Sequence, residues 1–417
     1  MESRRVVVTG IGALTPIGNN LQDYWNSLIN GVSGAAPITN FDASNFKTRF
    51  ACEVKNFEVA DFIHRKEARK LDRFSQYALV ATNEAFVDSG LNKDAIDSDR
   101  AGVIWGSGIG GMQTFQNEAS AFATGSGIPR YNPFFIPKLI SDIPAGHISI
   151  KYGFRGPNFT TVSACASSTN ALIDAFNYIK WNKADVFVAG GSEACVFETG
   201  IGGFNAMMAL SIRNDDPKTA SRPFDKDRDG FVMGEGGGAV VLEEYEHAIK
   251  RGATIYAEVV GGGLTADAHH ITAPHPKGLG ARNVMKLAIE DAGVSVSDID
   301  YINVHGTSTP LGDIAETKAI KDLFGEHAYN LNISSTKSMT GHLLGAAGVI
   351  ESIACIMAVK NNIVPPTINH VTDDPDIDNK LNLTFNKAQK RKVNYALTNT
   401  FGFGGHNASV LFKKYES

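Results

Sequence analysis

The chain has 417 residues, of which 43% are hydrophobic and 20% charged, an ordinary globular composition with enough length for a large buried core. A net charge of −5 marks neither nucleic-acid nor membrane binding, so a charged partner would need a local patch. The four cysteines are scattered without a CxxC pair, which favours a reducing compartment and excludes both a disulfide scaffold and a zinc finger.

The amino terminus, MESRRVVVTGIGALTPIG, combines two arginines with an apolar run and so imitates a signal peptide. Thr9, Gly10, Gly12 and Thr15 interrupt that run, and no small-residue cleavage site follows it. We expect a buried strand and a glycine turn instead. The most apolar later stretch, 343–359, contains a glutamate and is too short to span a bilayer, so the sequence predicts a cytoplasmic protein.

Short β-branched runs that end in small or turn residues alternate with helix-like segments along the chain. Strands are expected within RRVVVTG, RAGVIWG, ADVFVAGG, IYAEVVGGG, IDYINVHG and VNYALTNT, and helices over 75–90, 166–180, 281–293, 313–324 and 343–360. Strands that alternate with helices predict a mainly parallel sheet with helices packed against it.

A cationic cluster lies at 64–73, HRKEARKLDR, with its arginines and lysines in helical spacing. The ordinary interpretation of such a run is a solvated helix face. In a chain of net negative charge, the same cluster is also a candidate docking surface for an acidic partner.

Two short motifs imitate ligand-binding loops. GSGIGG (106–111) follows a strand and matches GxGxxG, but no clear acidic ribose ligand completes a dinucleotide site. DKDRDG (225–230) opens like a calcium loop, yet its twelfth position is Gly236, Glu235 is one residue out of register, and a glycine-rich strand follows instead of a helix. We therefore expect no dinucleotide at the first motif and a turn at the second.

Cys165 lies in TTVSACASSTNALIDA (160–175), where a run of small and polar residues becomes helix-periodic. A thiol at a helix N-terminus lies beside unpaired backbone N–H groups and the positive end of the helix dipole. Both effects lower a thiol's pKa and favour a nucleophilic thiolate. A buried structural cysteine is the alternative, and it is what we expect of Cys52, Cys195 and Cys355.

Two histidines follow in the second half of the chain. His305, in VHGTSTPLGD, comes directly after a predicted strand, where α/β folds place ligand groups. His342, in TKSMTGHLLGAAG, begins another predicted helix, five residues after Lys337. Neutral imidazoles there would donate Nε2–H to an oxyanion, and the ordinary alternative is a structural hydrogen bond. Zinc bound by Cys165 and both histidines is a third interpretation, but the metal would quench the thiolate.

The two halves of the chain also look alike. NEAFVDSGL (83–91) resembles KLAIEDAGV (286–294), and each leads to a strand and then to a polar turn that opens an apolar helix. These features predict an internal duplication with its dyad near position 250, and chance similarity is the alternative. In a duplicated fold, the helix N-termini near Cys165 and His342 would converge on one central site.

Over almost its whole length the chain resembles the β-ketoacyl-acyl-carrier-protein synthases, the condensing enzymes of fatty-acid elongation, and most closely those of type II. The phrases that carry the resemblance are RRVVVTGIGALTPIG, VSACASSTNAL, RPFDKDRDGFVMGEG, NVHGTSTPLGD, TKSMTGHLLGAAG and NTFGFGGHN, in the family's order. The resemblance implies an α/β thiolase-like fold with duplicated βα halves, here 1–252 with the cysteine and 253–417 with the histidines. Their layers would stack α/β/α/β/α.

The resemblance makes Cys165 the nucleophile that takes the growing acyl chain from a carrier-protein thioester. The backbone N–H groups of Cys165 and Phe403 would form an oxyanion hole, and the Phe403 ring would gate the acyl tunnel. His305 and His342 would hold the enolate left when malonyl-acyl-carrier protein loses carbon dioxide. That carbanion attacks the acyl-cysteine, so the implied enzyme is an acyltransferase that extends the chain by two carbons.

Supporting roles are also implied by the resemblance. Lys337, paired with Glu316, would hold the His342 loop, and Thr307 and Thr309 would bind the pantetheine arm. No cofactor is required, because loss of carbon dioxide drives the reaction and phosphopantetheine arrives on the carrier protein. The other implied positions are tunnel residues Ile109, Cys195, Gly200 and Phe204, with Phe134 or Phe135 from the partner of a homodimer, and a structural sodium or potassium ion at Asn303, Glu351 and Asn399.

The acidic acyl-carrier protein is the implied partner, with Arg65, Lys66, Arg69, Lys70 and Arg130 as its docking face. The chain departs from some relatives at Met207 and Met208, where those relatives carry a basic residue. Three rival interpretations remain. A thiolase would need a second cysteine in FGFGGHN, a non-catalytic chain-length partner would lack Cys165, and a cysteine hydrolase would use one histidine with an orienting Asn or Asp. A polyketide ketosynthase would share the same chemistry.

Overall fold

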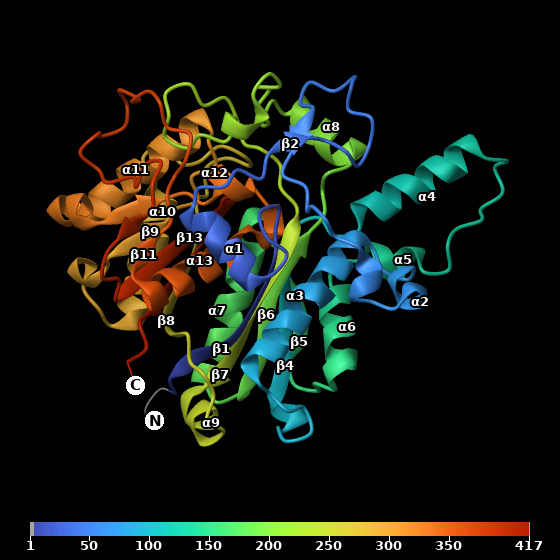
Figure 1. The fold of residues 1–417 in the computed structure, drawn as a ribbon, viewed down its shortest axis with the longest axis horizontal. Coiled ribbons are helices and arrows are strands. Elements are labelled where there is room, and N and C mark those ends of the chain that lie inside the picture. The colour runs from blue at the N-terminus through green and yellow to red at the C-terminus, as the bar shows by residue number, and fades with distance from the viewer. Residues whose placement is uncertain (1–3, 417) are drawn as a thin grey trace.

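The computed structural model describes residues 4–416, and its centre is a ten-stranded sheet in the order β10-β9-β13-β14-β8-β1-β7-β6-β4-β5 (Figure 1). In chain order, the first five strands of this sheet are β1 (Val6–Leu14), β4 (Ala101–Gly106), β5 (Asn158–Thr161), β6 (Val186–Glu193) and β7 (Gly236–Glu244). The second five are β8 (Ala257–Ala266), β9 (Tyr301–Asn303), β10 (Asn332–Ser334), β13 (Tyr395–Gly402) and β14 (His406–Lys413). All six predicted strands are among them.

Both halves of the sheet have the same strand order. Numbered along the chain within each half, the strands lie 3-2-4-5-1, as β5-β4-β6-β7-β1 and as β10-β9-β13-β14-β8. The halves meet where β1 pairs with β8. The repeated order agrees with the internal duplication expected from the sequence.

The expectation of a mainly parallel sheet is wrong. Three strands of each half are parallel, but β7, β1, β14 and β8 pair antiparallel with their neighbours. The turn between β13 and β14 shows why, because Gly402 pairs with His406 across it and Gly404 and Gly405 take φ values of +90° and +76°. So short a connection can join only antiparallel strands.

The helices form layers around the two half-sheets. Outside the first half lie α3 (Arg73–Ser89) and α6 (Ile143–Tyr152), and outside the second lie α10 (Leu279–Ala292) and α11 (Pro310–Phe324). Between the halves lie α7 (Ser167–Lys180) and α13 (Ala347–Asn361), each in contact with strands of both (Figure 1). The five predicted helices all form, and the layers are α/β/α/β/α as expected.

A side-chain contact repeats between the halves as well. Asp88 on α3 accepts a hydrogen bond from the Ile11 N–H of β1 at 2.9 Å, and Asp291 on α10 accepts one from the Gly262 N–H of β8 at 3.1 Å. These aspartates hold equivalent places in the two similar sequence segments. The duplication therefore extends to the way each outer helix is attached to its sheet.

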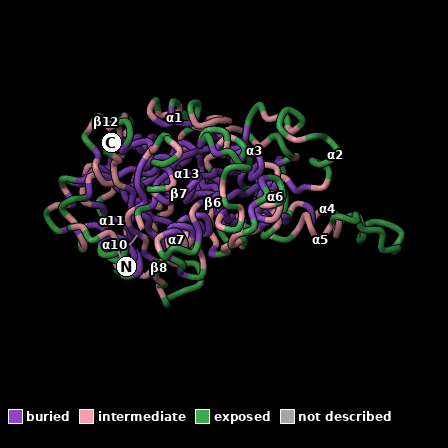
Figure 2. Tube along the Cα trace, turned by 90° about the horizontal axis from the view of Figure 1, so that it is seen from below, coloured by how far each residue is buried: buried purple, intermediate pink, exposed green. Residues whose placement is uncertain are grey.

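The central strands and α13 form the deeply buried centre of the fold (Figure 2). The segment Leu344–Asn361, which includes α13, is long and apolar enough to cross a bilayer, but 89% of it is buried inside the protein. The expectation that this stretch is too short to span a bilayer is therefore wrong, and its burial identifies it as a core helix. The other helices and short strands are α1 (Leu21–Ile29), β2 (Ala36–Pro37), β3 (Phe50–Ala51), α2 (Arg65–Ala68), α8 (Glu198–Ala206), α9 (Tyr245–Lys250), α12 (Lys337–Thr340), β11 (Ile363–Val364) and β12 (Gln389–Lys390).

An arm made of α4 (Met112–Thr124), α5 (Phe135–Leu139) and the loop between them projects from the body beside α2 (Figures 1 and 2). We call 112–139 the arm. Its exposed large apolar side chains are Met112, Phe115, Phe122, Ile128, Tyr131, Phe134 and Ile136. A segment with this much exposed apolar surface indicates an interaction site.

Candidate active site

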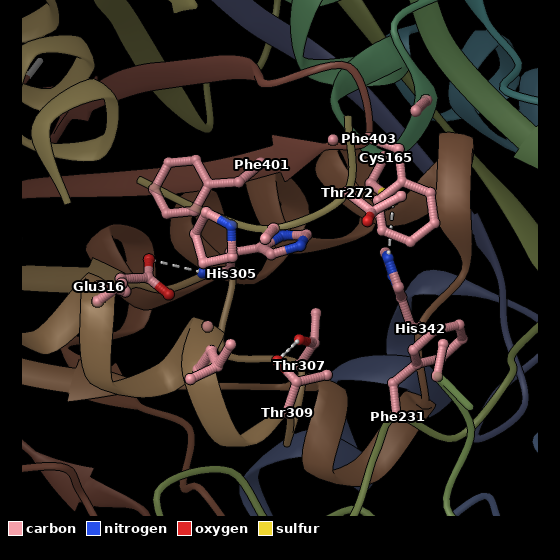
Figure 3. Close-up of a pocket in the computed structure, with 18 of the residues that line it drawn as sticks. Cys165, Phe231, Thr272, His305, Thr307, Thr309, Glu316, His342, Phe401 and Phe403 are labelled. Carbon is pink, nitrogen blue, oxygen red and sulfur yellow. Dashed lines mark hydrogen bonds between the residues drawn. The ribbon is translucent and has the colours of Figure 1, made fainter. Parts of the chain in front are cut away.

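A cavity of about 580 Å³ lies between the two halves, at the N-terminal ends of the central helices. It brings together sequence-predicted residues from distant parts of the chain (Figure 3). The predicted residues that line it are Ile109, Cys165, Phe204, His305, Thr307, Thr309, Glu316, His342 and Phe403.

Cys165 lies in a sharp turn, Ala164–Ala166, that leads directly into α7. Ala164 has a φ of +50°, a conformation that costs a non-glycine residue free energy and persists only where the surroundings enforce it. The second half repeats the turn at Leu344–Ala346 before α13, where Leu344 has a φ of +49°. The two turns contact each other, so the two helix N-termini converge as the duplication predicts.

The thiol of Cys165 is not acidified by its position. Burial raises its pKa to about 12, although the Lys337 ammonium and the Phe403 N–H act in the opposite direction. The expectation of a lowered pKa is therefore wrong, because removal of the thiolate from water outweighs the helix terminus. At neutral pH the resting group is a thiol, and a nearby base must take its proton when it attacks.

His342 supplies such a base. Its Nε2 lies 3.0 Å from Cys165 Sγ, and its ring meets that of His305 edge to face with centroids 5.3 Å apart (Figure 3). His342 is buried and His305 is half-buried, and loss of hydration together with the Lys337 ammonium holds the pKa values of both well below the ordinary 6.5. Two neutral imidazoles therefore line the cavity that holds the thiol.

The segment Phe231–Gly234 holds His342 in place. The His342 N–H donates to the Val232 carbonyl at 2.8 Å, and the Gly234 N–H donates to the His342 carbonyl at 2.9 Å. The Phe231 ring packs against the imidazole at 5.3 Å between centroids. Sequence reasoning missed this role for Phe231, although the residue lies inside one of the phrases that carry the family resemblance.

The neighbouring DKDRDG motif is a turn, as predicted. The Asp225 carboxylate accepts hydrogen bonds from the backbone N–H groups of Asp227, Val371 and Thr372. Arg228 pairs with Asp374 at 2.5 Å. The charged side chains of Asp225 and Arg228 therefore find their partners within the protein.

His305 is positioned by Glu316. The Glu316 carboxylate accepts the His305 N–H at 2.9 Å, the Gly306 N–H at 2.8 Å and the Asn399 amide at 3.2 Å (Figure 3). The expected Lys337–Glu316 pair is not formed, because Lys337 makes its ion pair with Glu351 on α13. Glu316 thus holds the His305 turn through two backbone N–H groups and links it to Asn399 on β13.

The aromatic and tunnel residues divide into two groups. Ile109 and Phe204 line the cavity, and the ring of Phe204 lies 6.4 Å from that of Phe403. Cys195 packs in the same apolar cluster as Cys165, and a Cβ on Gly200 would lie 2.2 Å from the Cys195 carbonyl. Phe134 and Phe135 lie on the arm of this chain, outside the described cavity lining.

The Thr307 and Thr309 hydroxyls lie 3.1 Å apart on the cavity wall (Figure 3). At the expected cation position, Asn303 Oδ1 and Glu351 Oε2 are buried without a hydrogen-bond partner among the described residues, as is Thr398 Oγ1 on the neighbouring strand. Buried unpaired oxygens fit a small cation. Asn399 fits less well, because its Oδ1 accepts the Ser409 hydroxyl at 2.6 Å.

The GSGIGG loop surrounds a carboxylate of the protein itself. The N–H groups of Gly108, Ile109 and Gly110 all donate to the buried side chain of Glu193, at the end of β6. Sequence reasoning missed Glu193, whose only signal is an acidic residue that ends a predicted buried strand. The loop's donors are thus occupied by an internal anion.

The cationic cluster is on the surface. Arg65, Lys66 and Arg69 are exposed, and Lys70 pairs with Glu67 at 2.9 Å and lies over the ring of Phe134. The helical spacing is realised only over α2, since a turn at 69–72 separates it from α3. Arg130 is exposed on the arm, apart from the cavity lining.

Comparison with known proteins agrees with this geometry. Residues 3–248 match the family model "Beta-ketoacyl synthase, N-terminal domain", and residues 256–371 match "Beta-ketoacyl synthase, C-terminal domain". The chain is 49% identical over 418 residues to a 3-oxoacyl-acyl-carrier-protein synthase 2 of Synechocystis sp., covering 100% of this chain and 99% of the relative. It is 50% identical over 416 residues to the Staphylococcus aureus protein of the same name, covering all of both.

Among solved structures, the chain is similar to the ishigamide ketosynthase/chain length factor. The TM-score is 0.92 at 34% identity, and the match covers 99% of this chain and 100% of the other.

Proposed function

The chain belongs to the beta-ketoacyl synthase family and is an acyltransferase that performs the condensation of fatty-acid elongation, and on this premise we propose which residues carry the reaction. Cys165 is the acyl acceptor, and His305 and His342 stabilise the enolate. The single observation that carries this assignment is the cavity that both imidazoles line and in which His342 Nε2 lies 3.0 Å from Cys165 Sγ.

In the first step, Cys165 Sγ attacks the thioester carbonyl of acyl-acyl-carrier protein. His342 Nε2, the nearest base, takes the thiol proton as the new C–S bond forms. The carrier's pantetheine sulfur leaves with that proton. The N–H groups of Cys165 and Phe403 stabilise the oxyanion of the tetrahedral intermediate, and the Phe403 ring gates the tunnel beside Phe204.

In the second step, malonyl-acyl-carrier protein loses carbon dioxide, and the electrons of the broken C–C bond form an enolate. Exchange of ring protons with solvent first moves the proton of neutral His342 from Nδ1 to Nε2. His305 and His342, both neutral, then donate Nε2–H to the enolate oxygen. The enolate carbon attacks the acyl-cysteine, a C–C bond forms, the C–S bond breaks, and Cys165 leaves as a thiolate that takes a proton from solvent. The product is a β-ketoacyl-acyl-carrier protein that is two carbons longer.

Three further groups support these steps. Lys337, held by Glu351, keeps the histidines neutral, and Glu316 holds the His305 turn. The Thr307 and Thr309 hydroxyls hold the pantetheine arm at the cavity. A sodium or potassium ion on Asn303 and Glu351, beside Asn399, would balance buried charge and supply no redox or covalent chemistry.

The acyl-carrier protein docks on exposed cations in this proposal. Arg65, Lys66 and Arg69 are free to meet its acidic surface, and exposed Arg130 and the partly exposed Lys70 complete the proposed docking set. The names of both relatives include an acyl-carrier protein. At the cavity, Met207 and Met208 offer apolar contact instead, and Met208 is 82% exposed.

Two organisational proposals accompany the function. The repeated strand order supports a division into halves 1–252 and 253–417. The four cysteines are buried free thiols, which suits a reducing, cytoplasmic compartment.

The assignment is tested by incubating the protein with acyl-carrier protein that bears a labelled acyl chain and then mapping the labelled peptide. We expect the label on the peptide that contains Cys165, with slower loading from acyl-pantetheine, which lacks the docking surface. Malonyl-acyl-carrier protein should then discharge the label into a longer β-ketoacyl chain. Label on another cysteine, or label that malonyl-acyl-carrier protein does not discharge, would refute the proposal.

We also propose a homodimer in which the arm packs against the partner, beside the edge strand β5. Glutamate at Phe122 or Ile136 places a charge in an apolar contact, so we expect the dimer dissociation constant to rise by at least about tenfold for each substitution. Sedimentation velocity measures this against Val371→Glu, an exposed valine away from the arm. A monomeric wild type, or arm variants that dimerise like the control, would contradict the proposal.

A further inference from the structure

The Glu193 carboxylate is an anion enclosed by hydrogen-bond donors. It is 0% exposed, and its Oε1 accepts from the Ile109 N–H at 3.2 Å, the Gly110 N–H at 3.1 Å and the Ser107 hydroxyl at 3.3 Å. Its Oε2 accepts from the Gly108 N–H at 2.8 Å and the Gly345 N–H at 3.0 Å. Both oxygens are therefore satisfied inside the protein.

No cation pairs with this carboxylate among residues 4–416. Burial raises the pKa of Glu193, and the four backbone N–H groups oppose that effect. A buried carboxylate without a counter-ion depends on such donors for its stability. The interaction is therefore mutual, since the donors hold the carboxylate and the carboxylate holds two segments of chain, the Ser107–Gly110 loop and the Gly345 turn.

Those two segments meet the turn that carries the acyl acceptor. The loop of Gly108 follows β4, and a Cβ on Gly108 would lie 3.0 Å from Glu193 and 3.3 Å from the Ala164 carbonyl, beside Cys165. Gly345 belongs to the equivalent turn of the second half, and a Cβ there would lie 2.3 Å from the Gly108 N–H nitrogen. Glu193 thus ties the Gly345 turn to the loop by hydrogen bonds, and the loop in turn packs closely against the Cys165 turn.

The tied segments form part of the cavity wall. Gly108, Ile109 and Leu344 line the cavity with Cys165, whereas Glu193 is not among the described residues that line it. Glu193 bonds the backbone of Ile109 itself, so it determines how far the Ile109 side chain projects beside the acyl-cysteine.

We propose, resting on the proposed function, that Glu193 is a positioning residue that fixes the Ser107–Gly110 loop against the two turns and thereby sets the acyl chain that the cavity accepts. It touches neither substrate nor reacting atoms. The GSGIGG loop, which matches a dinucleotide-binding pattern, would then line the acyl site and select its substrate while its N–H groups bind Glu193.

Glu193→Gln is the first test, because glutamine keeps the shape but turns an NH₂ group toward N–H donors that needed an oxygen. Whichever way the amide lies, it loses the contacts of Oε1 or of Oε2, and the loop is released. We expect the ratio of kcat/KM for long-chain against short-chain acyl-acyl-carrier protein to change by about tenfold, the effect of altered apolar contact in a pocket. Decarboxylation of malonyl-acyl-carrier protein alone should stay within about twofold, since the histidines are held by other contacts.

The matched control is Glu84→Gln. Glu84 is another carboxylate that accepts two backbone N–H groups, from Ala13 and Leu21, but it lies on α3 away from the cavity. Glu84→Gln should lower the melting temperature without changing the chain-length ratio. If Glu193 had a merely structural role, Glu193→Gln would behave in the same way.

If Glu193→Gln does not fold, Ser107→Ala takes its place as the test, because it removes only one weak hydrogen-bond donor to the carboxylate. We expect Ser107→Ala to change the chain-length ratio in the same direction as Glu193→Gln, but by a smaller factor. An unchanged ratio in whichever of these variants folds would overturn the proposal. Failure of the wild type to condense at all would instead refute the proposed function, so the two failures are distinguishable.

Discussion

Cys165→Ala is expected to abolish condensation, with a fall of roughly four orders of magnitude or more in turnover, because no other group can carry the acyl chain. Cys165 is the thiol that faces an imidazole in the cavity, and its high pKa means that the unassisted thiol would be unreactive. Condensation of acyl- and malonyl-acyl-carrier protein, followed by product mass, measures the loss.

The control for that variant is Cys355→Ala. Cys355 is also a fully buried free thiol, but it lies on α13 and donates to the Leu397 carbonyl at 3.6 Å. It should fold with slightly lower stability and retain condensation. If Cys165→Ala still condensed the two substrates, the nucleophile would have to be another residue.

Cys165→Gln separates the two half-reactions. The glutamine amide would lie where the acyl-cysteine carbonyl lies in the intermediate, while His305 and His342 remain in place. We therefore expect this variant to release carbon dioxide from malonyl-acyl-carrier protein faster than the wild type without forming an extended chain.

Local sequence pattern was enough to predict the positions of the central residues. The small residues before Cys165 and before His342 precede apolar helical periodicity, and the structure has a sharp turn before a buried helix at both places. His305 could be placed because it follows a strand. These signals depend on neighbours within a few positions, and the duplication then predicted that the two turns meet.

Features that depend on distant packing could not be read in this way. Glu316 and Glu351 are both acidic residues on buried helices, and only the packing of α13 against α12 shows that Lys337 pairs with Glu351. The thiol pKa was predicted wrongly because the helix terminus is visible in the sequence, whereas burial by Phe231, Leu344 and other residues of the same cluster is not. Glu193 was missed because its five donors come from segments in both halves.

His305→Ala and His342→Ala are both expected to lose malonyl decarboxylation by about 10²–10³-fold, the usual effect of removing one oxyanion donor. The two variants should differ in the other half-reaction. Of these two histidines, His342 is the one whose ring lies within hydrogen-bonding distance of Cys165 Sγ, so His342→Ala should also slow acyl loading, while His305→Ala should load normally.

Carbon dioxide release and acyl labelling, measured separately, distinguish these outcomes. His327→Ala is the matched control, since His327 bonds the Ile299 carbonyl at 2.9 Å outside the described cavity lining and should leave both half-reactions unchanged. Normal decarboxylation in either site variant would remove that histidine from its role. If His305→Ala and His342→Ala slowed acyl loading equally, both histidines would be needed to deprotonate the thiol. The short contact between His342 and Cys165 would then not by itself identify the proton acceptor.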